Sequence, residues 1–291
     1  MQDVYKIDKA RVRASFDRAA KTYDAAAVLQ AEVRQRMLDR LNLIKISPEL
    51  ILDAGCGTGH ASQALGKRFK QSRVVALDIA LGMLRQTAQQ QSLMRRLLGR
   101  QASICADIEQ LPLASQSVDL LWSNLAIQWC NDLDAAFSEM HRVLQPEGLL
   151  MFSTFGPDTL KELRQASAAD PAHVHVSRFI DMHDIGDAIV RAGFSAPVLD
   201  VEHFTLTYND VVAVMRDLKA IGAHNAADGR PRGLLGKGFL QQLTENYEQF
   251  RLAGKLPATF EVVYGHAWKP EARPQLDNGV EPITFKPRNR T

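Results

Sequence analysis

The sequence predicts an α/β fold, a mostly parallel sheet with helices on both faces. Between residues 29 and 154, short apolar runs alternate with stretches of helical period, which is typical of β-α-β units. The first run leads into a glycine-rich turn, LDAGCGTGH at residues 52–60, and polar residues close the first four runs. Ligands of open parallel sheets bind at the carboxyl ends of the strands. The pattern therefore indicates a ligand site at one edge of the sheet.

Size and composition narrow the class of protein. The 291 residues suit one large domain or two small ones, and a net charge of +2 is too small to indicate nucleic-acid binding. No run approaches the roughly 18 apolar residues of a membrane span, so we expect no membrane association. The start of the chain lacks an apolar signal segment, and the three cysteines lack metal-ligand spacing. We therefore expect a cytoplasmic protein with reduced thiols and no metal.

A helical arm is expected over residues 1–45, ahead of the first strand. Its clearest helix has apolar residues every four positions, at Leu29, Val33, Met37 and Leu41. The main domain, residues 46–268, then begins with five strands, predicted at 50–54, 74–77, 102–106, 118–123 and 149–154. Pro146 and Gly148 predict a turn before the fifth strand.

The alternation changes beyond residue 154. The elements predicted there are helices at 159–166 and 182–192 and strands at 198–208 and 259–268. Residues 208–258 separate the last two strands and have helical patterns, so we expect a helical lid over the sheet and not a second domain. The tail, residues 269–291, carries four prolines among charged residues and is expected to be disordered.

The glycine turn gives the first functional signal. Gly55, Gly57 and Gly59 allow backbone amides to approach a bound group, but the dinucleotide fingerprint needs a glycine at position 60, where His60 stands. Asp53, at the end of the first strand, would repel a pyrophosphate and attract an ammonium or sulfonium group. The charge therefore favours S-adenosylmethionine over a dinucleotide.

Three further strands also end in polar residues. Asp78 ends the second strand, 25 positions after Asp53, where an acid can accept both hydroxyls of a ribose. Asp107 ends the third strand and Asn124 the fourth. Such residues also serve as helix caps and turn formers, so each alone is weak support. The ordered set favours a nucleoside-containing ligand.

With these motifs the chain resembles the class I S-adenosylmethionine-dependent methyltransferases. ILDAGCGTG matches their first motif, and VVALD, ADIEQLP and VDLLWSNLAIQW match the next three. The resemblance implies a Rossmann-like, seven-stranded sheet, mostly parallel with an antiparallel last strand. It also implies that the glycine loop holds the methionine part of the cofactor, Asp78 the ribose and Asp107 the adenine amine. Met83 would pack on the adenine, with Ile108 beside it.

A narrower resemblance, to the malonyl-acyl-carrier-protein O-methyltransferases of biotin synthesis (BioC), covers nearly the whole chain. It rests on FDRAAKTYDAAAVLQ, SNLAIQWC, STFGPDTLKELR, FIDMHDIGDAIVRAGF and VYGHAW; the long polar tail departs from it. The implied reaction methylates the free carboxylate of a malonyl thioester, giving the methyl ester that primes pimelate formation and S-adenosylhomocysteine. A carboxylate is already ionised at neutral pH, so no catalytic base is expected.

Orienting groups are expected in place of a base. In related enzymes an aromatic residue of the arm folds over the cofactor, and Tyr23 holds that place. Gln128 and Trp129 follow the fourth strand, at the mouth of the transfer site. An arginine would grip the malonyl carboxylate, and Arg178 and Arg216 are both candidates. His141 is expected to be a packing residue.

The implied partner, an acidic carrier protein, would dock on a basic rim. Candidate patches are the cations of the first 40 residues, Arg95, Arg96 and Arg100, and Arg230, Arg232 and Lys237. We expect a monomer. Two alternatives stay open: a methyltransferase for another small acid, a quinone or a base, and a cofactor-binding assembly protein without catalysis. SNLAIQW lacks the N-P-P-Y-like tetrad of base methylation, and the intact glycines weigh against lost catalysis.

Overall fold

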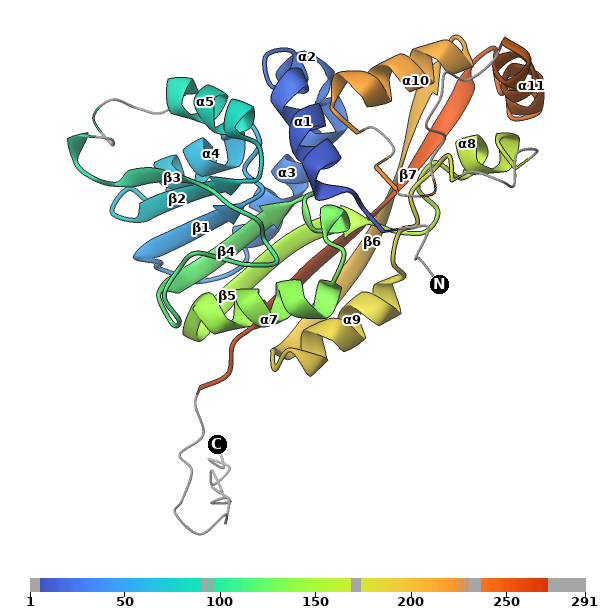
Figure 1. Ribbon diagram of the computed structural model, residues 1–291. Helices are drawn as coiled ribbons and strands as arrows, with labels where there is room; N and C mark the ends of the chain where they lie inside the picture. The colour runs from blue at the N-terminus through green and yellow to red at the C-terminus, as the bar shows by residue number, and fades with distance from the viewer. Residues whose placement is uncertain are drawn as a thin grey trace.

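A seven-stranded sheet forms the centre of the molecule (Figure 1). The computed structural model describes residues 6–90, 94, 97–168, 174–223, 226, 227, 229 and 237–271. The strands are β1 (Leu50–Ala54), β2 (Arg73–Asp78), β3 (Gln101–Cys105), β4 (Val118–Asn124), β5 (Leu144–Phe155), β6 (Ser195–Tyr208) and β7 (Leu256–Trp268). They lie in the order β3-β2-β1-β4-β5-β7-β6. β1 to β5 are parallel, and β7 is antiparallel to both of its neighbours, which confirms the predicted sheet.

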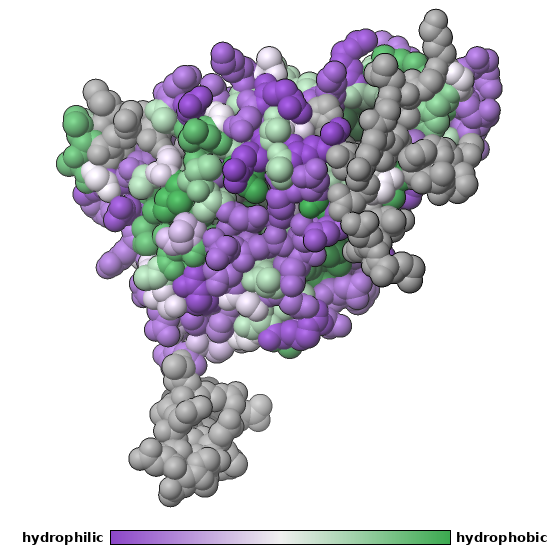
Figure 2. All heavy atoms as spheres, viewed as in Figure 1, coloured by the Kyte–Doolittle hydropathy of each residue, from purple (hydrophilic) through white to green (hydrophobic). Residues whose placement is uncertain are grey.

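Helices cover both faces of this sheet. They are α1 (Lys9–Ala19), α2 (Tyr23–Ala26), α3 (Val28–Leu41), α4 (His60–Arg68), α5 (Leu81–Gln90), the short 3-10 helix η1 (Ile127–Trp129), α7 (Leu133–Val143), α8 (Lys161–Ala166), α9 (Met182–Arg191), α10 (Val211–Ala220) and α11 (Lys237–Glu248). One apolar core lies between the sheet and α3 and α4, and a second lies under α7 and α9. The face covered by α7 and α9 is largely hydrophilic in Figure 2.

The predicted helical arm is present. The stripe of Leu29, Val33, Met37 and Leu41 is buried in the core on the α3 face, each residue at most 5% exposed. Burial of such a side chain contributes about 1.5–3 kcal/mol, so this stripe fixes α3 to the sheet. α1 and α2 continue across the end of the sheet, where α1 packs on α5 (Figure 1).

The turn expected at Pro146 and Gly148 is instead an irregularity within a longer strand. β5 begins at Leu144, which pairs with Val118, and regular pairing resumes at Leu149 opposite Leu120. Between them Glu147 has a positive φ of 60°. The strand continues past these residues because both of its ends are paired with β4.

Lys269, which the sequence assigned to the tail, belongs to the packed domain. It is 9% exposed, and its Nζ donates to the carbonyl oxygens of His141 and Leu144, both at 2.8 Å. A cation at the last carbonyls of α7 satisfies groups that the helix leaves unpaired. Residues 272–291, the remainder of the expected tail, lie outside the described residues.

Residues 208–258 contain α10 and α11, in keeping with their helical pattern. Two residues between these helices contact the arm: Ala226 accepts from the Asp8 amide at 2.9 Å, and Ala227 forms a β-bridge with Ile7. Across the described ranges, no helix combines the length and the hydropathy that crossing a bilayer requires.

We expect Gly265→Ala to lower the free energy of unfolding by about 1–3 kcal/mol, because an added Cβ would lie 2.2 Å from the ring of Phe152 on β5. Phe152 is fully buried and has no room to retreat. Urea denaturation followed by circular dichroism measures the change. Gly238→Ala in α11 is the control, because its Cβ would meet nothing within 4 Å; it should be neutral or stabilising by up to about 1 kcal/mol. Equal losses in both variants would contradict the packing argument.

Candidate functional site

A cavity lies at the carboxyl ends of β1 to β4, covered by the helical arm. Most of the predicted cofactor residues meet there, together with residues of the arm. Its lining consists of Lys9, Val12, Phe16, Tyr23, Gly55, Gly57, Asp78, Ile79, Met83, Ala106, Asp107, Ile108, Asn124, Leu125, Ala126, Trp129 and Cys130. Four strands contribute to it through the loops that follow them, as the strand-end pattern predicted.

The three glycines of the loop have different roles. Gly57 has a φ of 54° and lines the cavity, and a Cβ on it would meet nothing within 4 Å. A Cβ on Gly55 would lie 2.2 Å from the Cβ of Ala126, and one on Gly59 would lie 2.6 Å from Thr87. Gly55 and Gly59 are therefore required for packing, whereas Gly57 leaves space for a ligand. Gly59 is not among the lining residues.

Asp78 joins the glycine loop to the end of β2. Its Oδ2 accepts from the Gly57 amide at 2.9 Å and its Oδ1 from the Ala80 amide at 2.8 Å. Burial raises the pKa of this carboxyl to about 6, although the two amides favour the ionised form. Each oxygen has two acceptor sites, so Asp78 can still receive two hydroxyl groups from a ligand.

Asp53 lies behind the loop and not in the cavity, contrary to the expectation of a charge facing the ligand. It is 1% exposed, and its Oδ2 accepts from the hydroxyl of Ser62 at 2.6 Å. Burial raises the pKa of this carboxyl to about 7. Asp53 therefore fastens β1 to α4, and its attraction for a cationic ligand is weaker than the sequence suggested.

Aromatic side chains close the arm side of the cavity. The Phe16 ring contacts the Trp129 ring edge-on, with centroids 5.4 Å apart, and lies 6.5 Å from that of Tyr23. Burial and the charges of Asp78 and Asp24 raise the pKa of Tyr23, so its hydroxyl stays protonated. Sequence reasoning missed Phe16, although it precedes Tyr23 in the same segment, FDRAAKTYD.

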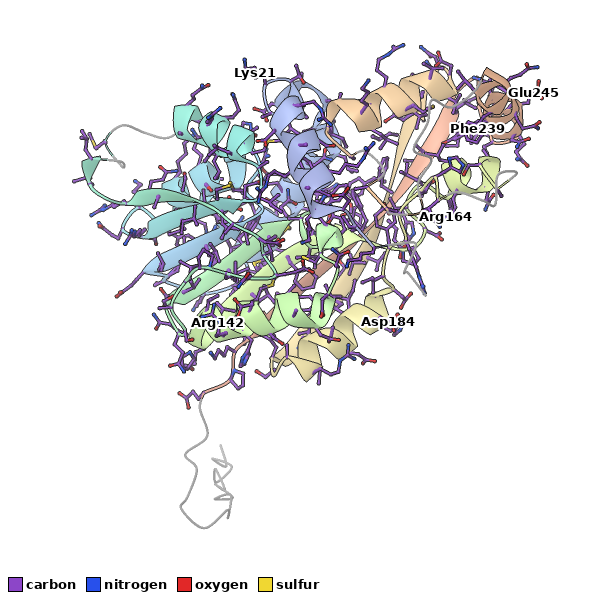
Figure 3. All side chains as sticks on the ribbon, in the orientation of Figure 1. Lys21, Arg142, Arg164, Asp184, Phe239 and Glu245 are labelled. Atoms are coloured by element: carbon purple, nitrogen blue, oxygen red, sulfur yellow. The ribbon has the colours of Figure 1, made fainter. Side chains whose placement is uncertain are left out.

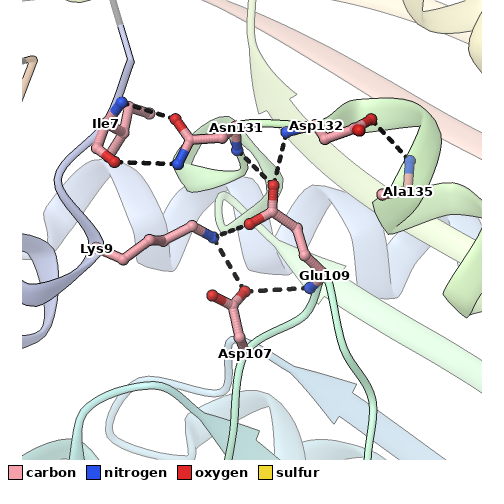
Figure 4. Close-up of polar contacts among 7 residues, drawn as sticks. All are labelled: Ile7, Lys9, Asp107, Glu109, Asn131, Asp132 and Ala135. Atoms are coloured by element: carbon pink, nitrogen blue, oxygen red, sulfur yellow. Dashed lines mark hydrogen bonds and ion pairs between the residues drawn. The ribbon is translucent and has the colours of Figure 1, made fainter.

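An ion-pair network also holds the arm (Figure 4). The Lys9 Nζ lies 3.0 Å from Asp107 Oδ1 and 2.5 Å from Glu109 Oε2. Glu109 Oε1 accepts from the amides of Asn131 and Asp132, both at 2.6 Å. Asp107, the residue expected to face the adenine amine, therefore forms an ion pair with Lys9 of the arm. Lys9 and Glu109 had no signal in the sequence, because Lys9 lies 98 positions from Asp107.

A larger cleft of about 1130 Å³ adjoins the covered cavity, and Cys130 lines both. Gln128 and Arg178 lie in this cleft. The Gln128 Nε2 donates to the Leu125 carbonyl at 2.6 Å, which fixes the amide. Arg164 of α8 and Asp184 of α9, labelled in Figure 3, also line the cleft. The structure thus separates the predicted positioning residues, with Tyr23 and Trp129 in one cavity and Gln128 in the other.

Other predicted residues lie elsewhere. Arg216 is exposed on α10 and is not among the residues that line either cavity. His141 packs edge-on against Phe194 at 5.1 Å, as expected of a packing residue, and burial lowers its pKa. The Arg100 guanidinium donates to the Lys70 carbonyl. The other predicted basic patches lie largely outside the described part of the chain. This applies to Arg95, Arg96, Arg230 and Arg232 and to the side chain of Lys237.

One group of side chains outside both cavities has metal-ligating atoms. Asp158, His203 and Glu261 offer atoms that all lie within 4.8 Å of one another. Asp158 is paired with Lys161 at 2.9 Å, and Glu261 accepts from the Asp158 amide at 2.6 Å. A cation beside the ligands opposes metal binding, so we assign no ion to this group.

Comparison with known proteins identifies similar sequences. Residues 52–152 match the family model described as a methyltransferase domain. A malonyl-[acyl-carrier protein] O-methyltransferase from Methylovorus sp. (strain MP688) is 69% identical over 98% of this chain and 97% of its own length. The protein of the same name from Laribacter hongkongensis (strain HLHK9) is 57% identical over 99% of both chains.

Solved structures share the fold at low sequence identity. The YcgJ protein from Bacillus subtilis has a TM-score of 0.56 and 15% identity, covering 82% of this chain and 100% of that one. The Haemonchus contortus phosphoethanolamine N-methyltransferase 2, solved with phosphomonomethylethanolamine and S-adenosylhomocysteine, has a TM-score of 0.52 and 16% identity. The match covers 82% of this chain and 52% of that one. At these identities the likeness concerns the fold alone.

Gly57→Ala should weaken binding of S-adenosylhomocysteine by about 1–3 kcal/mol, because the new methyl group enters the open space of the cavity. Isothermal titration calorimetry measures the loss. The matched control is Gly59→Ala, whose methyl group meets Thr87; it should lower the melting temperature more and the affinity of the folded protein less. The reverse ranking would remove Gly57 from the binding surface.

The affinity for S-adenosylhomocysteine should fall as the pH drops through about 6. In the role that the resemblance implies, ionised Asp78 would accept the ribose hydroxyls; burial raises its pKa to about 6, so protonation would compete with binding. We expect binding up to about tenfold weaker at pH 5 than at pH 7. Asp78→Asn should bind more weakly and show a flatter profile. A wild-type profile that rises toward acid would contradict this role.

Proposed function

The chain belongs to the malonyl-[acyl-carrier protein] O-methyltransferase family, and on this premise we propose that it methylates the free carboxylate of malonyl-acyl-carrier protein with S-adenosylmethionine. The products are the malonyl methyl ester, which would prime pimelate formation in biotin synthesis, and S-adenosylhomocysteine. The observation that carries the proposal is the pair of adjoining cavities, one lined by the predicted cofactor residues and the other by Gln128 and Arg178.

The residues of the covered cavity fit the cofactor. Gly57 leaves open space for its methionine part, and the Asp78 carboxylate accepts the ribose hydroxyls. The Asp107 carboxylate accepts from the adenine amine. Met83 and Ile108, at most 9% exposed, supply apolar contacts to the ring. Each of these assignments combines the family resemblance with a position on the cavity wall.

The chemistry asks for position and not for a base. When bound, the cofactor supplies an electrophilic methyl group on a sulfonium. An oxygen of the malonyl carboxylate forms the new C–O bond while the C–S bond breaks and its electron pair stays on sulfur. No proton moves, since a carboxylate with a pKa of roughly 4 is ionised at neutral pH. Holding the two groups in line and excluding water can contribute on the order of 7–11 kcal/mol.

The chain supplies that positioning from two sides. Phe16, Tyr23 and Trp129 form the aromatic wall beside the cofactor and limit access of water. On the cleft side we assign the carboxylate grip to Arg178, because Arg216 lies on the exposed side of α10, away from the lining of either cavity. A guanidinium binds a carboxylate through two parallel N–H groups and so fixes its orientation.

The carrier protein completes the proposal. An acidic carrier would dock beside the exposed cation Lys6 of the cleft, and its arm would deliver the malonyl group to Arg178. We propose a monomer as the working unit. We propose that it acts in the cytoplasm, with neither nucleic acid nor membrane as a partner.

Mass spectrometry of malonyl-acyl-carrier protein after incubation with S-adenosylmethionine tests the function directly. We expect the malonyl group to gain one methylene. Methylation of a free small acid or a quinone, with the carrier left unchanged, would assign the chain to another acceptor. Cofactor binding without transfer to any of these acceptors would indicate an assembly protein.

Arg178→Ala should lower kcat/KM for the malonyl substrate, which corresponds to a loss of about 2–4 kcal/mol of transition-state stabilisation. This loss is expected when a charged hydrogen-bond partner is removed. Arg178→Lys should recover only part, because one ammonium cannot reproduce two parallel N–H contacts. Affinity for S-adenosylhomocysteine should stay near normal. Steady-state kinetics with Arg216→Ala as the matched control should give values near wild type. A large loss in Arg216→Ala, with Arg178→Ala active, would reverse the assignment.

A further inference from the structure

The first described residues of the arm line both cavities. Lys6 and Ile7 line the larger cleft, and Lys9, two positions later, lines the cofactor cavity. Asp8 between them caps α1, its side chain accepting from the Arg11 amide at 3.0 Å. The start of α1 is therefore anchored, and a shift of Lys9 would be transmitted to Ile7.

Lys9 is held on the cofactor side by two carboxylates. Asp107 and Glu109 lie two positions apart on the loop after β3, and both contact its Nζ. The three side chains are between 18% and 31% exposed, so solvent screens their interaction only in part. Without the ammonium the two carboxylates would repel each other. Lys9 therefore helps to set the direction in which the Asp107 carboxylate points.

A chain of hydrogen bonds continues from Glu109 to the cleft (Figure 4). Glu109 accepts from the amides of Asn131 and Asp132, where α7 begins. The Asn131 side chain in turn accepts from the Ile7 amide at 2.7 Å and donates to the Ile7 carbonyl at 3.0 Å. Both Ile7 and Asn131 line the cleft. An unbroken set of contacts thus joins the wall of one cavity to the wall of the other.

The arm also contacts two residues between α10 and α11. Ile7 forms a bridge with Ala227, and the Asp8 amide donates to the Ala226 carbonyl at 2.9 Å. Two positions further, Gly229 lines the cleft and accepts from the Val174 amide at 2.9 Å. The position of the arm therefore affects two stretches of the cleft, one at Asn131 and one at Gly229.

We propose that Lys9 is a positioning residue that couples cofactor binding to acceptor binding. Val12, Phe16 and Tyr23 of the arm line the cofactor cavity, so a bound cofactor would stabilise the arm in the position that it has in this structure. Lys9 then holds Ile7 in place and completes the cleft for the acceptor. This coupling is reciprocal, so the acceptor tightens cofactor binding by the same factor. The inference rests on the proposed function for the identity of the two ligands.

Calorimetry of S-adenosylhomocysteine with and without malonyl-acyl-carrier protein measures the coupling. For the wild type we expect the acceptor to tighten binding by about 5- to 150-fold. Lys9→Met should reduce this ratio to about 1 and raise KM for the acceptor more than it lowers kcat. Lys9→Arg, which keeps the charge, should restore most of the ratio.

Lys21→Met is the control, because Lys21 is an exposed cation of the same arm; this variant should keep the wild-type ratio. A wild-type ratio in Lys9→Met would overturn the proposal.

Hydrogen exchange tests the coupling without an acceptor. S-adenosylhomocysteine alone should slow exchange of the Ile7 amide, which donates to the Asn131 side chain, and of the Asp8 amide, which donates to the Ala226 carbonyl, in the wild type but not in Lys9→Met. If the ligand binds the wild type and these amides exchange unchanged, the coupling is wrong even where the malonyl group is methylated. If the amides respond but the malonyl group is never methylated, the proposed function fails and the coupling stands.

Asn131→Ala keeps the test decisive if Lys9→Met fails to fold. This variant leaves the Lys9 ion pairs in place and removes the clamp on Ile7. It should bind S-adenosylhomocysteine alone nearly as the wild type does, yet lose the acceptor-dependent tightening. Thermal melting confirms that the variant is folded. Retention of the full ratio in folded Asn131→Ala would also overturn the proposal.

Discussion

The site depends on one buried carboxylate, Asp78. It receives the amides of Gly57 and Ala80 and so joins the loop after β1 to the loop after β2. A buried charge is costly unless hydrogen bonds replace its water, and these two amides do so. Because Asp78 holds Gly57 at its positive φ, the open space at that glycine faces the cavity. The same side chain would therefore set both the proposed ribose position and the room for the methionine part.

The arm makes polar contacts with the loops after β1, β2 and β3, three of the four loops that line the cofactor cavity. Lys9 contacts the loop after β3, Asp17 accepts from an amide at the start of α5 after β2, and Asp24 accepts from a hydroxyl in the glycine loop after β1. These polar contacts place the aromatic side chains of the arm over the cavity. The arm and the proposed cofactor site thus use neighbouring groups, which is the physical basis of the coupling that we propose.

Because the proposed reaction includes no proton transfer, its rate depends mainly on how the arm and the cavities position the ligands. No side chain has to be tuned as a base, so the pKa values of the site follow from burial. Burial raises the pKa values of Asp53 and Asp78, and it also raises the pKa of Tyr23, so the Tyr23 hydroxyl stays protonated. The rate enhancement then depends on how well the two cavities hold their ligands in line and dry. In the coupling that we propose, Lys9 contributes to this positioning although it does not contact the reacting atoms.

The sheet and the end of it that binds the ligand could be predicted from the amino-acid sequence, because both depend on local patterns. Apolar runs of strand length and polar residues at their ends placed Asp78, Asp107 and Asn124 on one edge, since the carboxyl ends of parallel strands meet there. The four-residue spacing likewise located the buried stripe of α3. These features need no knowledge of which distant residues touch.

Which side chains face the cavities could be seen only in the folded chain. Asp53 ends a strand as Asp78 does, yet it packs against Ser62 behind the loop, because its direction depends on the helix that covers β1. Arg178 and Arg216 were equivalent in the sequence, since an exposed arginine carries no pattern that tells which surface it faces. The pairing of Lys9 with Asp107 joins positions 98 residues apart, and only the folded chain brings their charges together.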